Sequence, residues 1–148
     1  MITIQIKTTP ETEKMLKKFP GDTRDALVKG VTRATYFAES QAKKSFGQSG
    51  HLKARSGHLR RSIKTTVKEA YGKVIGELSS NVIYARIHEE GGVIKAKNVP
   101  YLRFKVGGSW VRVKEVTMPA RPFLEPAITE NLAKIHKIIT DTIAKELS

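Results

Sequence analysis

The chain has 148 residues, and its 27 lysines and arginines against 14 aspartates and glutamates give a formal net charge of +13. This length predicts a single domain, residues 1–148, that can bury a hydrophobic core, and the charge favours a polyanionic partner such as nucleic acid or an acidic protein surface. Because the chain has no cysteine, disulfides, thiolate metal sites and a cysteine nucleophile are excluded.

The N-terminal third is predicted to form one strand and two helices. Residues 1–7 alternate isoleucine with polar residues, which predicts a half-buried strand. Thr9, Pro10 and Glu11 are typical of a helix start, and Pro20 and Gly21 end that short helix. A longer helix is expected from Asp22 to about Phe46. Its apolar stripe consists mostly of small residues that allow close approach to a sheet or another helix: Leu27, Val31, Ala34, Ala38 and Ala42.

A basic stretch without acidic residues follows the long helix. Residues 47–57 contain three glycines and two serines, which predicts a flexible basic loop. No acidic residue occurs between Glu39 and Glu69. Over the same interval the cations are Lys43, Lys44, Lys53, Arg55, Arg60, Arg61, Lys64 and Lys68. A solvated surface would carry similar charges, but the absence of any carboxylate favours a partner-binding role.

The middle of the chain is expected to hold a helical turn, a hairpin and a second helical turn. Residues 56–63 are typical of a short capped helix. Residues 63–70 and 73–79 are expected to form a hairpin across Tyr71 and Gly72. The candidate core residues of these elements are Leu59, Ile63, Val67, Val74, Ile75 and Leu78. Residues 85–92 are expected to form a helical turn that ends at glycine.

The strongest hairpin pattern comes next. Residues 93–97 are a candidate strand that Pro100 limits to a sheet edge. Residues 101–106 and 110–116 flank Gly107, Gly108 and Ser109, which predicts a second hairpin. Its apolar side chains, expected to face the core, are Leu102, Phe104, Val106, Val111, Val113 and Val116. The opposite, exposed face carries Arg103, Lys105, Arg112 and Lys114, and no acidic residue falls between Glu90 and Glu115.

Residues 118–128 contain three of the six prolines and separate the strands from a helical tail. Proline fixes its own φ and pushes the preceding residue toward an extended conformation, so the segment should be stiff up to Pro126, which suits a first helical turn. Two interpretations stay open: a rigid anchor for a partner, or a connector whose Phe123 and Leu124 fill the core. The tail helix should cover an apolar sheet face with a stripe of Ile128, Leu132, Ile135, Ile139, Ile143 and Leu147.

Catalytic and metal-binding patterns are weak. Among the four histidines only His88 lies beside carboxylates, those of Glu89 and Glu90, and it lacks the i, i+4 spacing of a helical zinc site. No phosphate-binding glycine loop and no nucleophile-elbow motif is present. No apolar run approaches a membrane span, and the N-terminus has acidic residues where a signal peptide is apolar. We therefore expect a soluble protein that is not an enzyme and needs no cofactor or metal.

Three segments stand in a distinctive order: SGHLRRSI at residues 56–63, IYARIHEEGG at residues 83–92 and MPARPFL at residues 118–124. Together, at these separations, they resemble the virion morphogenesis, or tail-completion, proteins of tailed bacteriophages and prophages. The resemblance covers roughly residues 56–128. The sequence departs from the family pattern in its basic loop at residues 47–55, and in Glu125, which stands where a glycine or small residue is expected.

The resemblance implies a small α+β structural protein, with an antiparallel sheet of hairpins packed against a long helix in the N-terminal half and a long C-terminal helix. It also implies assembly with other neck or tail proteins, as a homo-oligomeric ring, for tail completion or head–tail joining. The protein would then be found in the virion, and in the host cytoplasm during assembly. No enzymatic activity, cofactor, membrane or small-molecule substrate is implied.

In this interpretation Arg121, Phe123 and Leu124 form the assembly interface. Contacts to an acidic partner or to nucleic acid would come from Lys53, Arg55, Arg60, Arg61, Arg103, Lys105, Arg112 and Lys114. A contact with DNA would be salt-sensitive and would discriminate little between bases. The alternative is a cytoplasmic nucleic-acid-binding protein, including a small basic ribonuclease of the toxin type. Its candidate catalytic residues are Arg60, Arg61, Arg86 and Tyr84.

Overall fold

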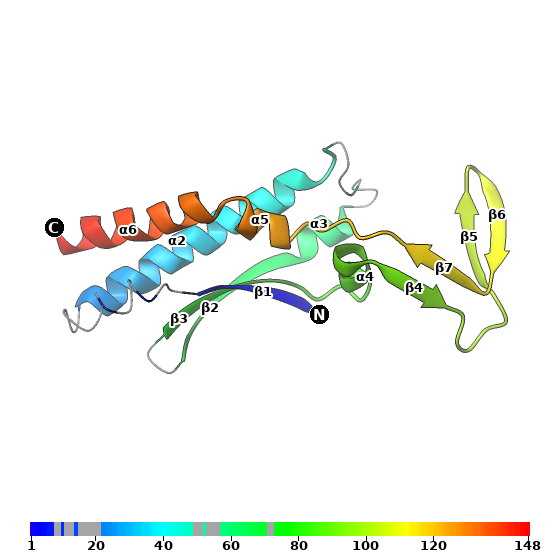
Figure 1. Ribbon diagram of the computed structural model, residues 1–148, viewed down its shortest axis with the longest axis horizontal. Coiled ribbons are helices and arrows are strands. Elements are labelled where there is room, and N and C mark those ends of the chain that lie inside the picture. The colour runs from blue at the N-terminus through cyan, green and yellow to red at the C-terminus, as the bar shows by residue number, and fades with distance from the viewer. Residues whose placement is uncertain (8–9, 11–13, 15–21, 49–51, 53–56, 71–72) are drawn as a thin grey trace.

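A computed structural model describes residues 1–7, 10, 14, 22–48, 52, 57–70 and 73–148. The molecule is elongated and consists of a body and a projecting arm (Figure 1). The body contains β1 (Ile2–Lys7), α2 (Asp22–Ser45), α3 (His58–Ser62), β2 (Ile63–Ala70), β3 (Lys73–Ser80), α4 (Ala85–Glu90), α5 (Glu125–Thr129) and α6 (Leu132–Leu147). The arm, residues 92–118, contains β4 (Gly92–Lys95), β5 (Leu102–Val106), β6 (Ser109–Val113) and β7 (Glu115–Met118). The short helix expected after Thr9 and most of the basic loop lie outside the described residues.

The body sheet has three antiparallel strands in the order β1-β3-β2. The predicted alternation of β1 is confirmed, since Ile2 and Ile6 are buried while Thr3 and Gln5 are exposed. The predicted hairpin is confirmed as β2 and β3, which pair from Ile63↔Ser80 onward. The sequence therefore identified all three strands of this sheet.

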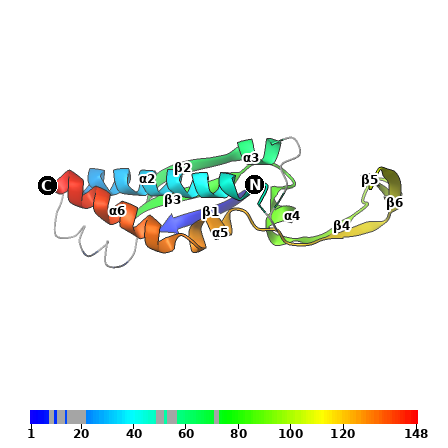
Figure 2. The same cartoon turned by 90° about the horizontal axis from the view of Figure 1, so that it is seen from above.

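Helix α2 is the centre of the body. It lies against β2 and β3 on one side, and α6 packs along its other side (Figures 1 and 2). The predicted stripe of small residues is buried. Two glycines outside that stripe, Gly30 of α2 and Gly76 of β3, make the two approaches close. A Cβ at Gly30 would lie 3.1 Å from the carbonyl oxygen of Ile139, and a Cβ at Gly76 would lie 2.1 Å from Thr35 Oγ1. These distances explain why α2 can touch the sheet and a second helix at once.

The helical tail differs in detail from its prediction. It consists of α5 and α6, which are separated at Glu130 and Asn131, rather than one continuous helix. Its stripe was expected to cover the sheet, but α6 packs chiefly on α2. Ile135, Ile139 and Ile143 are buried there, whereas Leu132 and Leu147 at the two ends are 45% and 42% exposed. The predicted α+β class, with antiparallel strands and two long helices, is confirmed.

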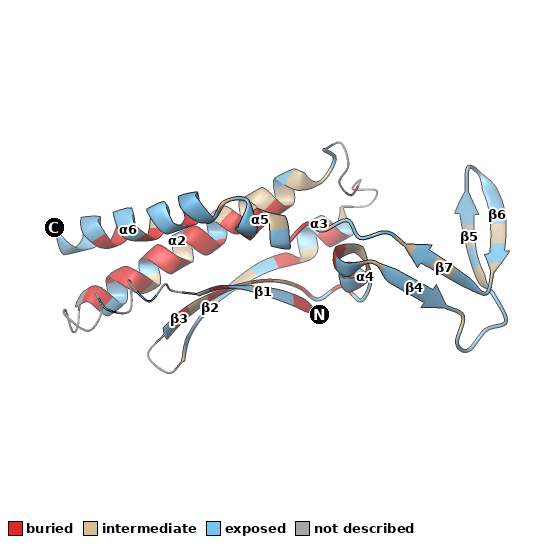
Figure 3. Cartoon of the chain, viewed as in Figure 1, coloured by how far each residue is buried: buried red, intermediate tan, exposed pale blue. Residues whose placement is uncertain are grey.

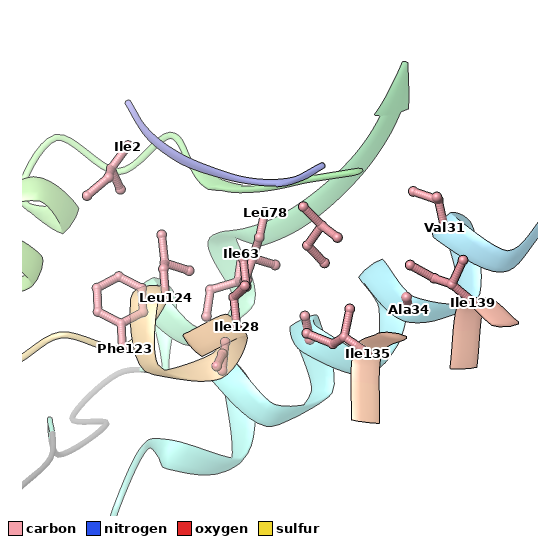
Figure 4. Packing of buried hydrophobic residues seen from close by; sticks show 14 of the residues in the cluster. Ile2, Val31, Ala34, Ile63, Leu78, Phe123, Leu124, Ile128, Ile135 and Ile139 are labelled. Atoms are coloured by element: carbon pink, nitrogen blue, oxygen red, sulfur yellow. The ribbon is translucent and has the colours of Figure 1, made fainter. Parts of the chain in front are cut away.

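The hydrophobic core lies between the sheet, α2, α5 and α6. Figure 4 shows Ile63 at the start of β2 and Leu78 of β3 in one cluster with Leu124 and Ile128. Phe123 and Leu124 are among the most deeply buried large side chains, at 1% and 0% exposure. The segment before α5 therefore closes one end of the core.

The arm contributes nothing to this core. None of residues 92–118, all of which the structure describes, is buried (Figure 3). The predicted hairpin is present as β5 and β6, joined by Gly107 and Gly108 at positive φ. The expectation that one of its faces is core is wrong, because no part of the body lies over that face and Val106 is 57% exposed. The second predicted strand also breaks at Lys114, and β7 turns away to pair with β4.

The contact between α2 and β3 can be tested with Gly76→Ala. The added Cβ would overlap Thr35 Oγ1, and overpacking of this kind destabilises by about 1–3 kcal/mol. The free energy of unfolding is measured by urea denaturation for Gly76→Ala, Thr35→Ala and the double variant. Because Thr35→Ala removes Oγ1, the double variant should lose less than the sum of the single losses. Strictly additive losses would contradict this packing.

Candidate assembly site

Helix α4 ends where the arm leaves the body. The predicted glycine stop is confirmed, because Gly91 has φ 71° and donates its N–H to the carbonyl of Ile87 at 3.0 Å. A Cβ at Gly91 would lie 2.7 Å from the backbone nitrogen of Ala120 and 3.0 Å from the carbonyl oxygen of Met118. Only glycine fits both the backbone conformation and this close approach. The strands that leave and re-enter the body are thus held side by side at one point.

Glu89 of α4 is buried at 7% exposure, and its carboxylate binds the start of α5. It accepts hydrogen bonds from the backbone N–H groups of Phe123 at 2.8 Å, Leu124 at 3.0 Å and Glu125 at 2.8 Å. The residue at the N-cap of α5 is Leu124, which has no side-chain acceptor. A carboxylate from a distant helix therefore satisfies the free donors of this helix start, where negative charge is favourable.

His88 adds a second link between the same segments. Its carbonyl oxygen accepts a hydrogen bond from the N–H of Arg121 at 2.7 Å. Its imidazole is partly buried and meets the Tyr84 ring edge-on, with 5.8 Å between ring centroids. Burial lowers the pKa of His88, and the positive charge of Arg121 lowers it further. We call the contacts of His88, Glu89 and Gly91 with residues 118–125 the junction.

The three residues predicted to form an assembly interface separate into two groups. Phe123 and Leu124 are buried in the core of their own subunit, and the Phe123 ring meets Phe46 edge-on at a centroid distance of 5.4 Å. Filling the core therefore accounts for these two side chains, which have no surface left to offer in this conformation. Arg121 alone is exposed.

The predicted partner-binding cations lie in two places. Arg60 and Arg61 are exposed on α3, whereas Arg103, Lys105, Arg112 and Lys114 are exposed on the arm. Lys53 and Arg55 lie outside the described residues. Acidic residues that flank the first basic stretch offset part of its charge, since Lys43 pairs with Glu39 one turn earlier in α2 and Lys68 pairs with Glu77 on the neighbouring strand.

The β5–β6 hairpin separates its side chains into two faces. Arg103 stands opposite Arg112 and Lys105 opposite Trp110, and these four residues form what we call the basic face. Trp110 is 58% exposed, with the Arg103 guanidinium 4.4 Å and the Lys105 ammonium 5.2 Å from its ring centroid. What we call the apolar face consists of Leu102, Phe104, Val106, Val111 and Val113.

Two of the four residues proposed for ribonuclease chemistry contact neighbouring side chains. Arg86 pairs with Glu90 at 2.8 Å, and Tyr84 packs against His88. Within the described ranges, no group of three or more potential metal ligands comes together, and no helix is long and apolar enough to cross a membrane.

The geometry defines a structural class before any comparison: a small α+β body that carries an exposed arm on a fixed base. The profile of the phage virion morphogenesis family matches residues 33–148, so the chain belongs to this family. Comparison with curated proteins and with solved structures gave no significant match. The resemblance based on three short segments is confirmed, and with it a role in phage virion morphogenesis, in a family that is structural rather than enzymatic.

The sequence interpretation missed the role of Glu89. It grouped this residue with His88 and Glu90 as a weak metal candidate. The sequence did contain a signal for this role at the start of α5. Residues 123–126 begin a helix without a serine, threonine, aspartate or asparagine cap. Unsatisfied donors at such a helix start require an acceptor from another part of the chain.

Glu89→Gln should destabilise the protein far more than Glu90→Gln. The amide has a single acceptor oxygen and turns an NH2 group toward backbone donors, so at least one of the three N–H groups loses its acceptor. Hydrogen bonds to charged groups contribute about 1.5–3 kcal/mol, whereas an exposed ion pair such as Arg86–Glu90 is screened by water and contributes little. Chemical denaturation measures both losses, and equal losses would contradict the capping role.

Stability should fall as the pH is lowered from the ordinary pKa of histidine, 6.5, through the lower pKa that His88 has in the folded protein. Because folding lowers the pKa of His88, the unfolded chain binds the proton more readily, and acid shifts the equilibrium toward it. Unfolding free energies measured above and below this pH range should differ less in His88→Gln. Arg121→Gln should reduce the difference in part, since Arg121 is the second cause of the shift. An unchanged pH dependence in His88→Gln is the result that would contradict this.

Proposed function

We propose that the chain acts in tail completion or head–tail joining, as a subunit that oligomerises and docks at the neck or tail of the particle. Membership of the virion morphogenesis family supports a structural role. The observation that carries the finer proposal is the arm, none of whose residues is buried in its own subunit (Figure 3). Such a segment leaves most of its surface free for a neighbour.

The apolar face of the hairpin favours a protein neighbour. An isolated two-stranded hairpin is at best marginally stable in water, and covering its apolar side chains stabilises it. A ring requires a heterologous interface, in which one surface of a subunit meets a different surface of the next. We propose that the next copy of the chain covers the apolar face, so that each arm reaches across a subunit boundary.

The junction supports this role by fixing the base of the arm. Three hydrogen bonds to Glu89 and the tight passage at Gly91 hold both connecting strands against α4. An element held in its bound orientation loses less entropy on association. Arg121 is exposed at the same place and is the one predicted interface residue that remains available to a partner.

The proposed role involves no catalysis and no cofactor. Its partners are neck or tail proteins and other copies of the chain. The place of action is the virion, with assembly in the host cytoplasm.

Shortening the arm tests the proposal. Lys95 pairs with Glu115, so residues 96–114 can be replaced by Asn-Gly, a dipeptide that closes a two-residue hairpin. Because the removed residues are not buried, the free energy of unfolding of the body should change by less than about 0.5 kcal/mol. Supplied in place of the wild-type gene, this variant should give no complete particles by plaque count and negative-stain microscopy.

The matched control retains the arm and changes only its tip. Gly107→Asn keeps the glycine at the second turn position and suits the positive φ of 57° at the first. This variant should assemble like the wild type. Normal particles from the chain with the shortened arm would show that the arm is not needed for assembly.

A further inference from the structure

The basic face of the hairpin lowers the stability of the hairpin in the isolated subunit. Arg103 stands directly opposite Arg112, and like charges in this position destabilise paired strands. Within the described part of the chain no acidic side chain pairs with Arg103, Lys105 or Arg112. The only acid in the arm is Glu115, whose carboxylate already lies 3.7 Å from Lys95 Nζ. A surface of this kind is explained by an anionic partner rather than by stability.

We propose that the basic face binds the phosphate backbone of duplex DNA, with little base discrimination. The major groove of B-DNA admits a two-stranded β-ribbon, and the hairpin is such a ribbon at the outer end of the arm, beyond β4 and β7 (Figures 1 and 2). Cations two residues apart on one strand lie about 7 Å from each other, so Arg103 and Lys105 can contact separate phosphates. The exposed ring of Trp110 lies on the same face, opposite Lys105, where a bound duplex would contact it.

DNA fits this face better than an acidic protein does. Protein surfaces mix charges of both signs, and a matching interface would carry some acidic residues, yet residues 91–114 contain none. DNA presents one charge per about 1.7 Å of its axis and is uniformly negative. The formal charge of +13 on the whole chain adds long-range attraction to such a polyanion.

The two faces of the hairpin serve different partners without competition. If the chain forms the proposed ring, a neighbouring copy covers the apolar face and the basic faces of successive arms remain open to one DNA molecule. This arrangement rests on the proposed function. The binding itself is a property of a single chain and is measured on the isolated protein.

Trp110 makes the test specific, because it is the only tryptophan in the chain. The full-length protein is titrated with a short duplex of random sequence at a series of salt concentrations, and tryptophan fluorescence is recorded. Binding should change the Trp110 emission, and the logarithm of the affinity should fall linearly with the logarithm of the salt concentration. In Arg103→Gln/Arg112→Gln the affinity should fall at least about tenfold and the salt slope should decrease by about 2.

The control variant is Arg33→Gln/Lys145→Gln, which removes the same charge from two residues beside Glu146. Glu146 is close in sequence to the C-terminus, which lies at the end of the body away from the arm (Figure 1). It should retain the wild-type salt slope. Equal losses in the two double variants, or no fluorescence change with DNA, would overturn the proposal. Displacement of the duplex by polyglutamate as effectively as by unlabelled DNA would also overturn it, in favour of an acidic protein partner. None of these results would bear on the proposed role in particle assembly, because that role is tested separately with the shortened arm.

Discussion

The carboxylate of Glu89 is the interaction on which the arrangement of the chain depends. It accepts the N–H groups of three successive residues at the start of α5, and hydrogen bonds to a charged acceptor are the strong ones. The same contact holds the returning strand of the arm against α4 and directs Phe123 and Leu124 into the core. One buried side chain thus connects the base of the arm, the start of α5 and the closure of one end of the core.

The body and the arm differ in how their side chains are packed. In the body, Gly30 and Gly76 let α2 approach α6 and the sheet closely, and the packed surfaces are apolar. In the arm, no residue is buried, and two arginines stand opposite each other on paired strands. Destabilising features such as these are expected at the surfaces through which a protein binds its partners. This contrast supports the proposal that the body provides stability and that the arm, which the junction holds in place, makes the contacts of assembly.

Elements that bury a face within the subunit were predictable from periodicity, and β1, α2 and the β2–β3 hairpin are examples. The β5–β6 hairpin was also predicted, but its placement was not, because alternation shows that one face is apolar without showing what covers it. The break at Glu130 and Asn131 was missed because the apolar stripe continues through it. The link from Glu89 to Phe123 spans 34 residues, beyond the reach of any local pattern.

Amide hydrogen exchange of Phe123, Leu124 and Glu125 tests the role of Glu89 most directly. These N–H groups bond to a side-chain carboxylate rather than to the backbone, so their protection reports on that contact. We predict that in the wild type they exchange as slowly as the amides of the core strands, and that Glu89→Gln releases them while α2 stays protected. Fast exchange of the three amides in the wild type would contradict the account.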